Sequence, residues 1–224
     1  RRGVRMAYIV ENNGVYGLTK GQFSATADRG SKSKKGVVNA DSPVDLVALA
    51  LQLGATYVAR SFSGDKAQLV PLIKGAMAHG GAAFIDVISP CVTFNNHGGS
   101  TKSYDYVRQH NEAVSRIDFM TPGEEITAQY APGEVVDVPQ HDGTTLRLRK
   151  LHEDYDPTDR FAALSYMNQH AQHGEVVTGL LYMDPLATDL HTAFNTCATP
   201  LNALRESHLC PGAGTLAKIN AALR

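Results

Sequence analysis

A short loop near the start of the chain carries the residues best suited to hold a ligand. It follows an apolar stretch at residues 6–10, expected to be a buried strand, and combines oxygen donors with glycines. Open α/β sheets bind ligands beyond the carboxyl ends of their strands, where this loop begins. The loop reads Asn12-Asn13-Gly14-Val15-Tyr16-Gly17-Leu18-Thr19-Lys20-Gly21-Gln22. We therefore expect a ligand here, although a bare Asn-Asn-Gly is more often a plain turn.

A second group with possible chemistry is the thiol of Cys91, which follows Ser89-Pro90 at the end of another apolar stretch. Thiolates bind iron–sulfur clusters, four to a cluster. A lone cysteine is more commonly a small buried apolar residue. The other two cysteines are Cys197 and Cys210. Three unevenly spaced cysteines form no disulfide framework and favour reduced thiols in the cytoplasm.

The elements that would position these residues alternate between strand and helix up to about residue 90. Strands are expected over 6–10, 56–60 and 82–88, and helices over 43–53 and 65–79. Asp41 or Ser42 is the expected N-cap of the first helix, and Asp65 that of the second. This alternation predicts an α/β fold with a doubly wound, mostly parallel sheet and helices on both faces.

Beyond Cys91 the pattern changes. Strand-like segments at 125–130, 135–138 and 145–151 are separated by turn signals and predict a small antiparallel excursion. A helix over 156–172 and a strand over 176–183 follow. The tail from residue 187 is expected to be a C-terminal arm over a partner subunit.

Composition narrows the classes of function. The 224 residues suit a single α/β domain with appendages, and the net charge is only −1. This argues against nucleic-acid binding, which requires a basic excess on one face. The apolar runs are far shorter than the roughly 20 residues that cross a bilayer, so we expect no membrane span.

Two strings resemble one known family. Residues 12–22 resemble the second half of the thiamine diphosphate motif in β subunits of 2-oxoacid:ferredoxin oxidoreductases, especially those that act on 2-oxoglutarate. Residues 86–97, Asp-Val-Ile-Ser-Pro-Cys-Val-Thr-Phe-Asn-Asn-His, resemble the same family independently. The resemblance implies the thiamine diphosphate-binding type of fold.

The resemblance also implies roles for individual residues. The side-chain oxygen of Asn13 and the main-chain carbonyl of Val15 would bind Mg²⁺, which takes hard oxygen ligands and bridges to the diphosphate. Leu18 and Lys20 would lie in the substrate pocket, where Lys20 could pair with a carboxylate; without the resemblance Lys20 would read as an exposed loop lysine. Cys91 would be one of four ligands of a [4Fe–4S] cluster. The residues implied to contact the cofactor are Asn13, Gly14, Val15, Tyr16, Gly17, Leu18 and Thr19.

At the level of the whole protein, the resemblance implies oxidative decarboxylation of a 2-oxoacid with coenzyme A and electron transfer to ferredoxin. An α subunit would be required, in an αβ or α2β2 assembly. The family's Gly-Asp-Gly-Asp segment and its other three cluster cysteines have no counterpart here, so we expect the C-terminal two thirds of a β subunit. Cys197 and Cys210 match no part of the family's cluster pattern, so we expect them to be packing residues. Residues 1–120 would be the C-terminal part of the cofactor-binding domain, and residues 121–224 the region that completes the subunit.

Three alternatives remain open at this point. The same chemistry could act on pyruvate or branched-chain 2-oxoacids. The chain could be a non-catalytic interaction module that retains the fold, or a thiamine enzyme without iron–sulfur, against which the Ser-Pro-Cys match argues.

Overall fold

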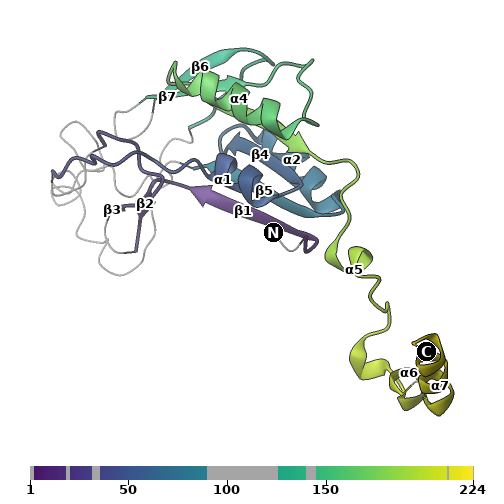
Figure 1. The fold of residues 1–224 in the computed structure, drawn as a ribbon. Helices are drawn as coiled ribbons and strands as arrows, with labels where there is room; N and C mark the ends of the chain where they lie inside the picture. Colours follow the sequence, from purple (N-terminus) through teal and green to yellow (C-terminus); the bar gives the residue numbers. More distant parts are fainter. Residues whose placement is uncertain are drawn as a thin grey trace, which may run out of the picture. The chain divides into compact units, whose positions relative to one another are not determined.

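The structure is a computed structural model that describes residues 3–18, 21–31, 36–89, 126–139, 145–210 and 212–223. The chain divides into two compact units, Arg1–Leu190 and His191–Arg224 (Figure 1). The predicted boundary at residue 120 lies outside the described residues and stays a prediction. None of the helices in the described ranges is long and apolar enough to span a membrane.

The first unit contains the elements that carry the predicted loop. In chain order they are β1 (Met6–Asn12), β2 (Val15–Tyr16), β3 (Gln22–Phe23), α1 (Leu46–Leu53), β4 (Tyr57–Phe62), α2 (Lys66–Ala78), β5 (Ala82–Ile88), β6 (Val135–Pro139), β7 (Thr145–Lys150), α4 (Arg160–Ala171) and β8 (Val176–Met183). Helix α5 (Leu190–Ala193) leads into the second unit, which contains the 3-10 helix η1 (Leu201–Ala203), α6 (Glu206–Leu209) and α7 (Gly212–Ala222).

Six strands form one mixed sheet in the order β1-β5-β4-β8-β7-β6. The pairs β1–β5, β5–β4 and β7–β8 are parallel, whereas β4–β8 and β6–β7 are antiparallel. The mostly parallel sheet with a small antiparallel excursion is therefore confirmed.

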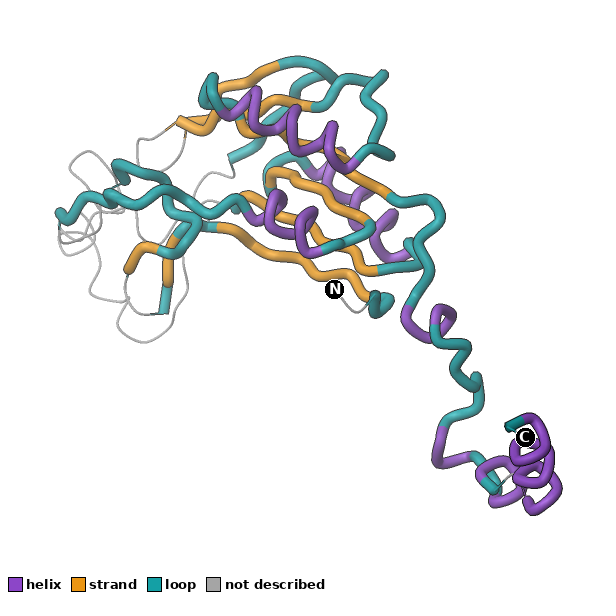
Figure 2. Tube along the Cα trace, in the orientation of Figure 1, coloured by secondary structure: helices purple, strands orange, loops and turns teal. Residues whose placement is uncertain are grey.

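Helices pack on both faces of this sheet (Figure 2). On one face, Leu51 of α1 and Met167 of α4 pack against Val58 of β4. On the other face, Leu72 of α2 packs against Ile85 of β5. Each helix buries one apolar stripe, as expected for a surface helix of an α/β domain. The doubly wound arrangement is confirmed.

The helix caps show where the sequence prediction was right and where it was wrong. Asp65 caps α2 as predicted and accepts a hydrogen bond from the Gln68 amide at 3.1 Å. Helix α1 begins later than predicted, because its N-cap is Asp45, not Asp41 or Ser42. The amide of Val44 instead donates to the carbonyl of Ala25 at 2.8 Å, which holds residues 41–44 outside the helix.

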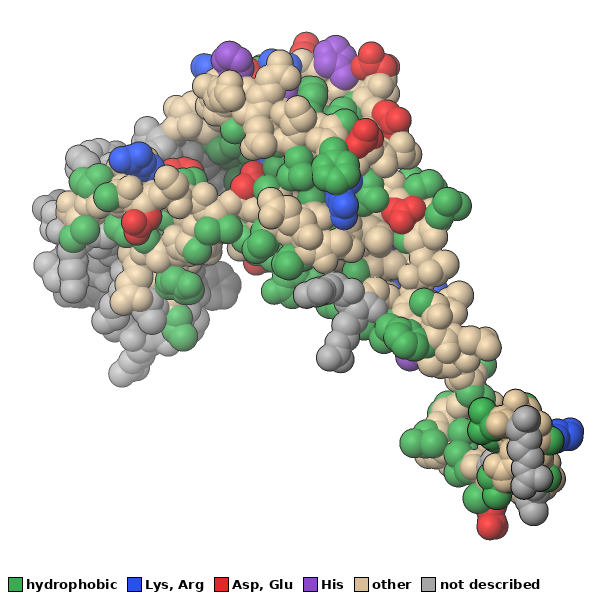
Figure 3. Space-filling view, in the orientation of Figure 1, with side chains coloured by type: hydrophobic (Ala, Val, Ile, Leu, Met, Phe, Trp, Pro, Cys, Tyr) green, Lys and Arg blue, Asp and Glu red, His purple; other side chains and the backbone are tan. Residues whose placement is uncertain are grey.

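Strand β1 is not buried as predicted. Among the strands that the structure describes, it lies at the edge of the sheet and pairs with β5 alone. Met6, Tyr8 and Ile9 are 48%, 56% and 42% exposed. Figure 3 shows hydrophobic side chains on the surface over β1 and α1. An apolar strand sequence specifies pairing but does not specify which strand occupies the edge.

Residues 126–130, predicted as part of a strand, have no regular secondary structure. They cross the turn between β4 and α2, where the Ala128 amide donates to the Gly64 carbonyl at 3.3 Å. Ala128 and Phe62 belong to one buried apolar cluster. The segment is therefore held by packing and a hydrogen bond to this turn, and not by pairing in the sheet.

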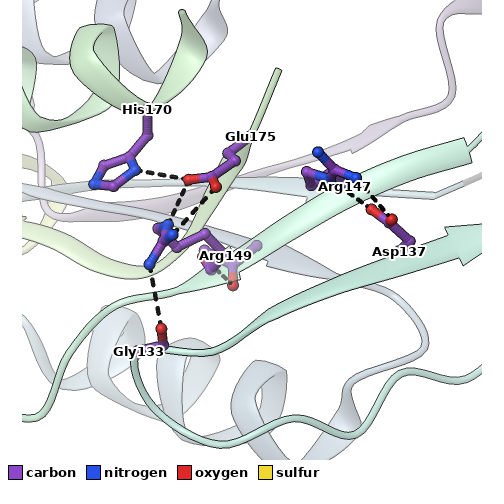
Figure 4. A network of polar contacts seen from close by, with 7 residues as sticks. Gly133, Asp137, Arg147, Arg149, His170 and Glu175 are labelled. Atoms are coloured by element: carbon purple, nitrogen blue, oxygen red, sulfur yellow. Dashed lines mark hydrogen bonds and ion pairs between the residues drawn. The ribbon is translucent and has the colours of Figure 1, made fainter. Parts of the chain in front are cut away.

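A network of charged side chains joins β7, α4 and the start of β8 (Figure 4). Arg149 donates from Nη2 to Glu175 Oε1 at 3.1 Å and from Nη1 to the Gly133 carbonyl at 3.2 Å. His170 Nδ1 is hydrogen-bonded to Glu175 Oε2 at 2.7 Å. Hydrogen bonds from Arg149, opposed by partial burial and reinforced by His170, lower the pKa of Glu175 to about 2.

This lowered pKa predicts a loss of stability in acid. The stabilisation by ionised Glu175 is complete above the pKa of unfolded glutamate, about 4.3, and disappears as the pH falls toward 2. Glu175→Gln should therefore reduce the free energy of unfolding by on the order of 1–2 kcal/mol at pH 6, allowing for solvent screening. The difference from wild type should shrink below about pH 4. Urea titrations from pH 2.5 to 6 measure it, and a difference that does not change with pH would contradict the assignment.

Candidate cofactor site at the carboxyl end of the sheet

The predicted loop leaves the carboxyl end of β1 and forms a small hairpin. Strands β2 and β3 pair antiparallel, with Val15 opposite Phe23 and Tyr16 opposite Gln22. The Gly21 amide donates to the Tyr16 carbonyl at 3.1 Å. The structure therefore places the loop at the sheet edge where ligands bind in open α/β folds.

Asn13 and Val15 present oxygen atoms at the start of this hairpin. Asn13 is exposed, and its Oδ1 accepts a hydrogen bond from the Val15 amide at 3.1 Å. The Ser24 amide donates to the Gly14 carbonyl at 3.0 Å. This hydrogen bond joins the residues on either side of the Val15–Phe23 pair. Val15–Phe23 is therefore a non-hydrogen-bonded pair of the antiparallel ladder. The Val15 carbonyl consequently points away from β3.

Two glycines allow the backbone to turn at this loop. Gly14 and Gly21 have φ values of 70° and 90°, in a region that side chains with a Cβ rarely adopt. The tight turns expected at these glycines are present. Their role toward a cofactor stays a prediction.

The other predicted site residues are less constrained. Leu18 is 99% exposed and Tyr16 is 57% exposed. Gly17 lies in the turn between the two short strands. Thr19, Lys20 and Cys91 lie outside the described residues, so their predicted roles are not tested by the structure.

The donors at this loop suit a hard cation in their chemistry. Mg²⁺ takes oxygen ligands, and an amide side chain and a main-chain carbonyl both supply them. Among the residues that the structure describes, no group of three or more His, Cys, Asp or Glu side chains is placed to hold a metal ion. The two predicted ligands, the Asn13 side-chain oxygen and the Val15 carbonyl, are of other types. Their chemistry fits a Mg²⁺ ion that would also bind a diphosphate.

Level with Val10, two residues before β1 ends, lies a buried charge cluster that the sequence analysis did not identify. Arg60 Nε donates to Asp86 Oδ2 at 2.9 Å, and Arg60 Nη2 donates to Asp45 Oδ1 at 2.7 Å. Arg60 and Asp86 are 7% and 1% exposed. Burial disfavours the charge on Arg60, but the two carboxylates outweigh it and raise the pKa of Arg60 above its ordinary value. The sequence contained one signal for this cluster: the opposite charges of Arg60 and Asp86 each lie within an apolar strand segment.

A second buried polar cluster lies between β4, α2, β7 and β8. Lys150 Nζ contacts Asp65 Oδ2 at 2.7 Å and lies 4.4 Å from the centroid of the Tyr130 ring. The Tyr130 hydroxyl is hydrogen-bonded to Thr178 Oγ1 at 2.7 Å, and burial raises the pKa of Tyr130 to about 12. These contacts join β7 and β8 to the start of α2.

Cys197 and Cys210, expected to be packing residues, are both free and exposed in this chain. Both lie in the second unit, where the described large apolar residues are also mostly exposed. The prediction that this arm covers a partner subunit stays a prediction.

Comparisons with known proteins bear on the whole site. Residues 1–87 match the sequence profile of the thiamine pyrophosphate enzyme, C-terminal TPP binding domain. A 2-oxoacid:ferredoxin oxidoreductase subunit beta from a Sulfolobus species is 48% identical over 97 residues, which are 43% of this chain and 32% of that protein. A 2-oxoglutarate synthase subunit KorB from Methanocaldococcus jannaschii is 32% identical over 143 residues, covering 62% of this chain and 53% of that protein.

A solved structure agrees with these relatives. It is the 2-oxoglutarate:ferredoxin oxidoreductase from Magnetococcus marinus, with 2-oxoglutarate, coenzyme A and succinyl-CoA bound. The match has a TM-score of 0.58 and 26% identity, and it covers 90% of this chain and 57% of that chain. The chain thus spans between about a third and somewhat more than half of the length of these relatives.

The thiamine diphosphate-binding type of fold, expected from the sequence, is confirmed by these matches. The two motifs and the comparisons point to one family: the chain is related to the β subunits of 2-oxoacid:ferredoxin oxidoreductases, and its first 87 residues correspond to the C-terminal TPP-binding domain of thiamine pyrophosphate enzymes.

Proposed function

We propose that this chain provides the thiamine diphosphate-binding part of a 2-oxoacid:ferredoxin oxidoreductase that acts on 2-oxoglutarate. The observation that carries the proposal is the loop after β1, which presents Asn13 and Val15 oxygens at the carboxyl end of the sheet, inside the stretch that matches the TPP-binding domain. The protein would be cytoplasmic and active only with an α subunit, as an αβ or α2β2 assembly.

In this proposal the loop binds the diphosphate through Mg²⁺. Asn13 Oδ1 and the Val15 carbonyl supply two ligands, and the turns at Gly14 and Gly21 let the backbone approach the phosphates. Thiamine diphosphate, when bound, supplies the electron sink for decarboxylation of a 2-oxoacid. Tyr16, Gly17, Leu18 and Thr19 would surround the cofactor and orient it.

The names of the relatives support a proposal for the substrate and the electron acceptor. 2-Oxoglutarate and coenzyme A would give succinyl-CoA and CO₂, and the two electrons released would reduce ferredoxin through a [4Fe–4S] cluster. Cys91 would provide one of the four thiolates. Lys20 would pair with a substrate carboxylate, and Leu18 would set the size of the pocket. The relatives named for 2-oxoglutarate support this substrate over pyruvate or branched-chain 2-oxoacids.

The rival proposals make different predictions. A non-catalytic module with this fold would not bind thiamine diphosphate. A thiamine enzyme without iron–sulfur would bind the cofactor but contain no iron.

The direct test is replacement of the proposed Mg²⁺ ligand. Asn13→Ala should weaken Mg²⁺-dependent binding of thiamine diphosphate by about ten- to a hundred-fold, because a charge-assisted contact contributes roughly 1.5–3 kcal/mol. Asn13→Asp keeps an oxygen ligand and should retain tighter binding than Asn13→Ala. Calorimetric titration of the complete enzyme, with and without Mg²⁺, measures both variants.

The matched control is Asn12→Ala. Asn12 Oδ1 accepts a hydrogen bond from the Thr26 hydroxyl at 2.7 Å, so its loss should lower stability and affect cofactor affinity less than Asn13→Ala. Wild-type affinity in Asn13→Ala would remove this loop from the cofactor site.

A further inference from the structure

The Arg60 cluster connects the sheet to the segment that lies beside the candidate cofactor loop. Arg60 and Asp86 are neighbours on the parallel strands β4 and β5. Asp45, the second partner of Arg60, caps α1 and accepts hydrogen bonds from the amides of Val47 and Ala48 at 2.9 and 3.0 Å. One guanidinium therefore ties the first turn of α1 to the central strands.

From Asp45, hydrogen bonds continue to the loop. Its neighbour Val44 donates from the backbone amide to the Ala25 carbonyl at 2.8 Å. The next residue, Thr26, donates from its hydroxyl to Asn12 Oδ1 at 2.7 Å. Asn12 directly precedes the proposed Mg²⁺ ligand Asn13.

The connection then returns to its starting point. Asn12 ends β1, and its carbonyl accepts a hydrogen bond from the Ser89 amide at 2.9 Å. Two residues earlier, Val10 of β1 stands opposite Asp86 of β5. The contacts therefore form a closed ring that runs from Asp86 through Arg60, Asp45, Ala25 and Thr26 to Asn12, and back through the strand pair.

We propose that Arg60 is a positioning residue for the cofactor loop. It fixes Asp45, and through Asp45 the described parts of residues 24–45, so that Asn12 and the adjoining Asn13 are held at the end of β1. This role rests on the proposed function, because it assigns the ring to thiamine diphosphate binding.

The geometry requires arginine specifically. Arg60 uses two different nitrogens, Nε and Nη2, to reach carboxylates on different elements. A lysine ammonium is a compact point charge and cannot reproduce this fork. Removing the cation alone would leave the buried Asp86 carboxylate without its partner, which is costly, whereas replacing both members of a buried pair by apolar residues is often tolerated.

Comparing the single with the double replacement therefore separates the positioning role of Arg60 from its contribution to stability. Three variants of the complete enzyme, assembled with its α subunit, are compared with wild type: Arg60→Met, Arg60→Lys and the double variant Arg60→Met with Asp86→Leu. Arg147→Gln is the matched control, because Arg147 forms an exposed ion pair with Asp137 on the antiparallel hairpin. The measurements are thermal unfolding, hydrogen–deuterium exchange in the cofactor-free protein, and the dissociation constant for thiamine diphosphate with Mg²⁺.

Arg60→Met should be destabilised, and the double variant should recover most of the lost melting temperature. In the double variant, amides in residues 21–31 and 36–45 should still exchange faster than in wild type, and thiamine diphosphate should bind at least about tenfold more weakly. Arg60→Lys should fall between wild type and Arg60→Met in affinity. Arg147→Gln should bind the cofactor like wild type.

Two outcomes would overturn the positioning role: wild-type exchange in these segments of the refolded double variant, or wild-type cofactor affinity in it. If the double variant does not fold, Arg60→Lys decides in the same way by its exchange and its affinity. A complete wild-type enzyme that fails to bind thiamine diphosphate at all would instead defeat the proposed function, which this comparison distinguishes.

Discussion

The Gly64→Ala protein is expected to be less stable than wild type by about 3 kcal/mol, the upper range for an added methyl in a packed site. A Cβ at Gly64 would lie 2.5 Å from Phe62 Cε1 and closer still to the main-chain oxygen of Ile126. A carbonyl cannot move away without carrying its chain segment, so residues 126–128 must shift from the turn between β4 and α2. The expected loss corresponds to a melting temperature lower by roughly 6–12 °C in a unit of this size.

Thermal and urea unfolding measure this loss. Gly214→Ala in α7 is the control, because its added Cβ meets no described atom within 4 Å outside the local helix backbone and alanine favours a helix more than glycine does. That control should be neutral or slightly stabilising. Wild-type stability of Gly64→Ala would show that residues 126–128 do not pack on this turn.

Loss of the Cys91 thiol should have the largest effect on activity. If Cys91 is a cluster ligand, Cys91→Ala should lower the iron content and abolish ferredoxin reduction. Thiamine diphosphate should remain bound, since the loop after β1 does not include this residue, and decarboxylation should persist in part. Iron analysis and electron paramagnetic resonance of the complete enzyme provide the measurement.

Cys197→Ala and Cys210→Ala are the matched controls. Both thiols are exposed and lie in the second unit, so neither change should alter iron content or ferredoxin reduction. An unchanged iron stoichiometry in Cys91→Ala would refute the cluster assignment, and it would favour a thiamine enzyme without iron–sulfur.

The sequence predicted those elements that are bounded by clear local signals. The strands at 82–88 and 176–183 match β5 and β8 because each is an apolar run that follows a glycine-containing turn. Helix α2 was predicted with its cap because Asp65 and the residues that follow act within one turn. In contrast, the exposure of β1 depends on which strands flank it, and no local pattern specifies this.

The candidate site, too, was predictable from the sequence only in part. Residues of the loop after β1 are contiguous in sequence, so their oxygen donors and glycines could be recognised together. The Arg60 cluster joins residues from three separate elements, and only the register between β4 and β5 places Arg60 beside Asp86. A charged residue within an apolar strand indicates that it has an oppositely charged partner, but the sequence does not identify that partner.

The position of β1 also bears on the order of folding. Its register partners run from Ala82 to Ile88, so β1 can join the sheet only after α1, β4, α2 and β5 have been made and arranged. Closing such a long loop is slow compared with forming local contacts. The loop that follows β1 therefore leaves the ribosome before β5 does, but it acquires its fixed shape only when β5 is in place.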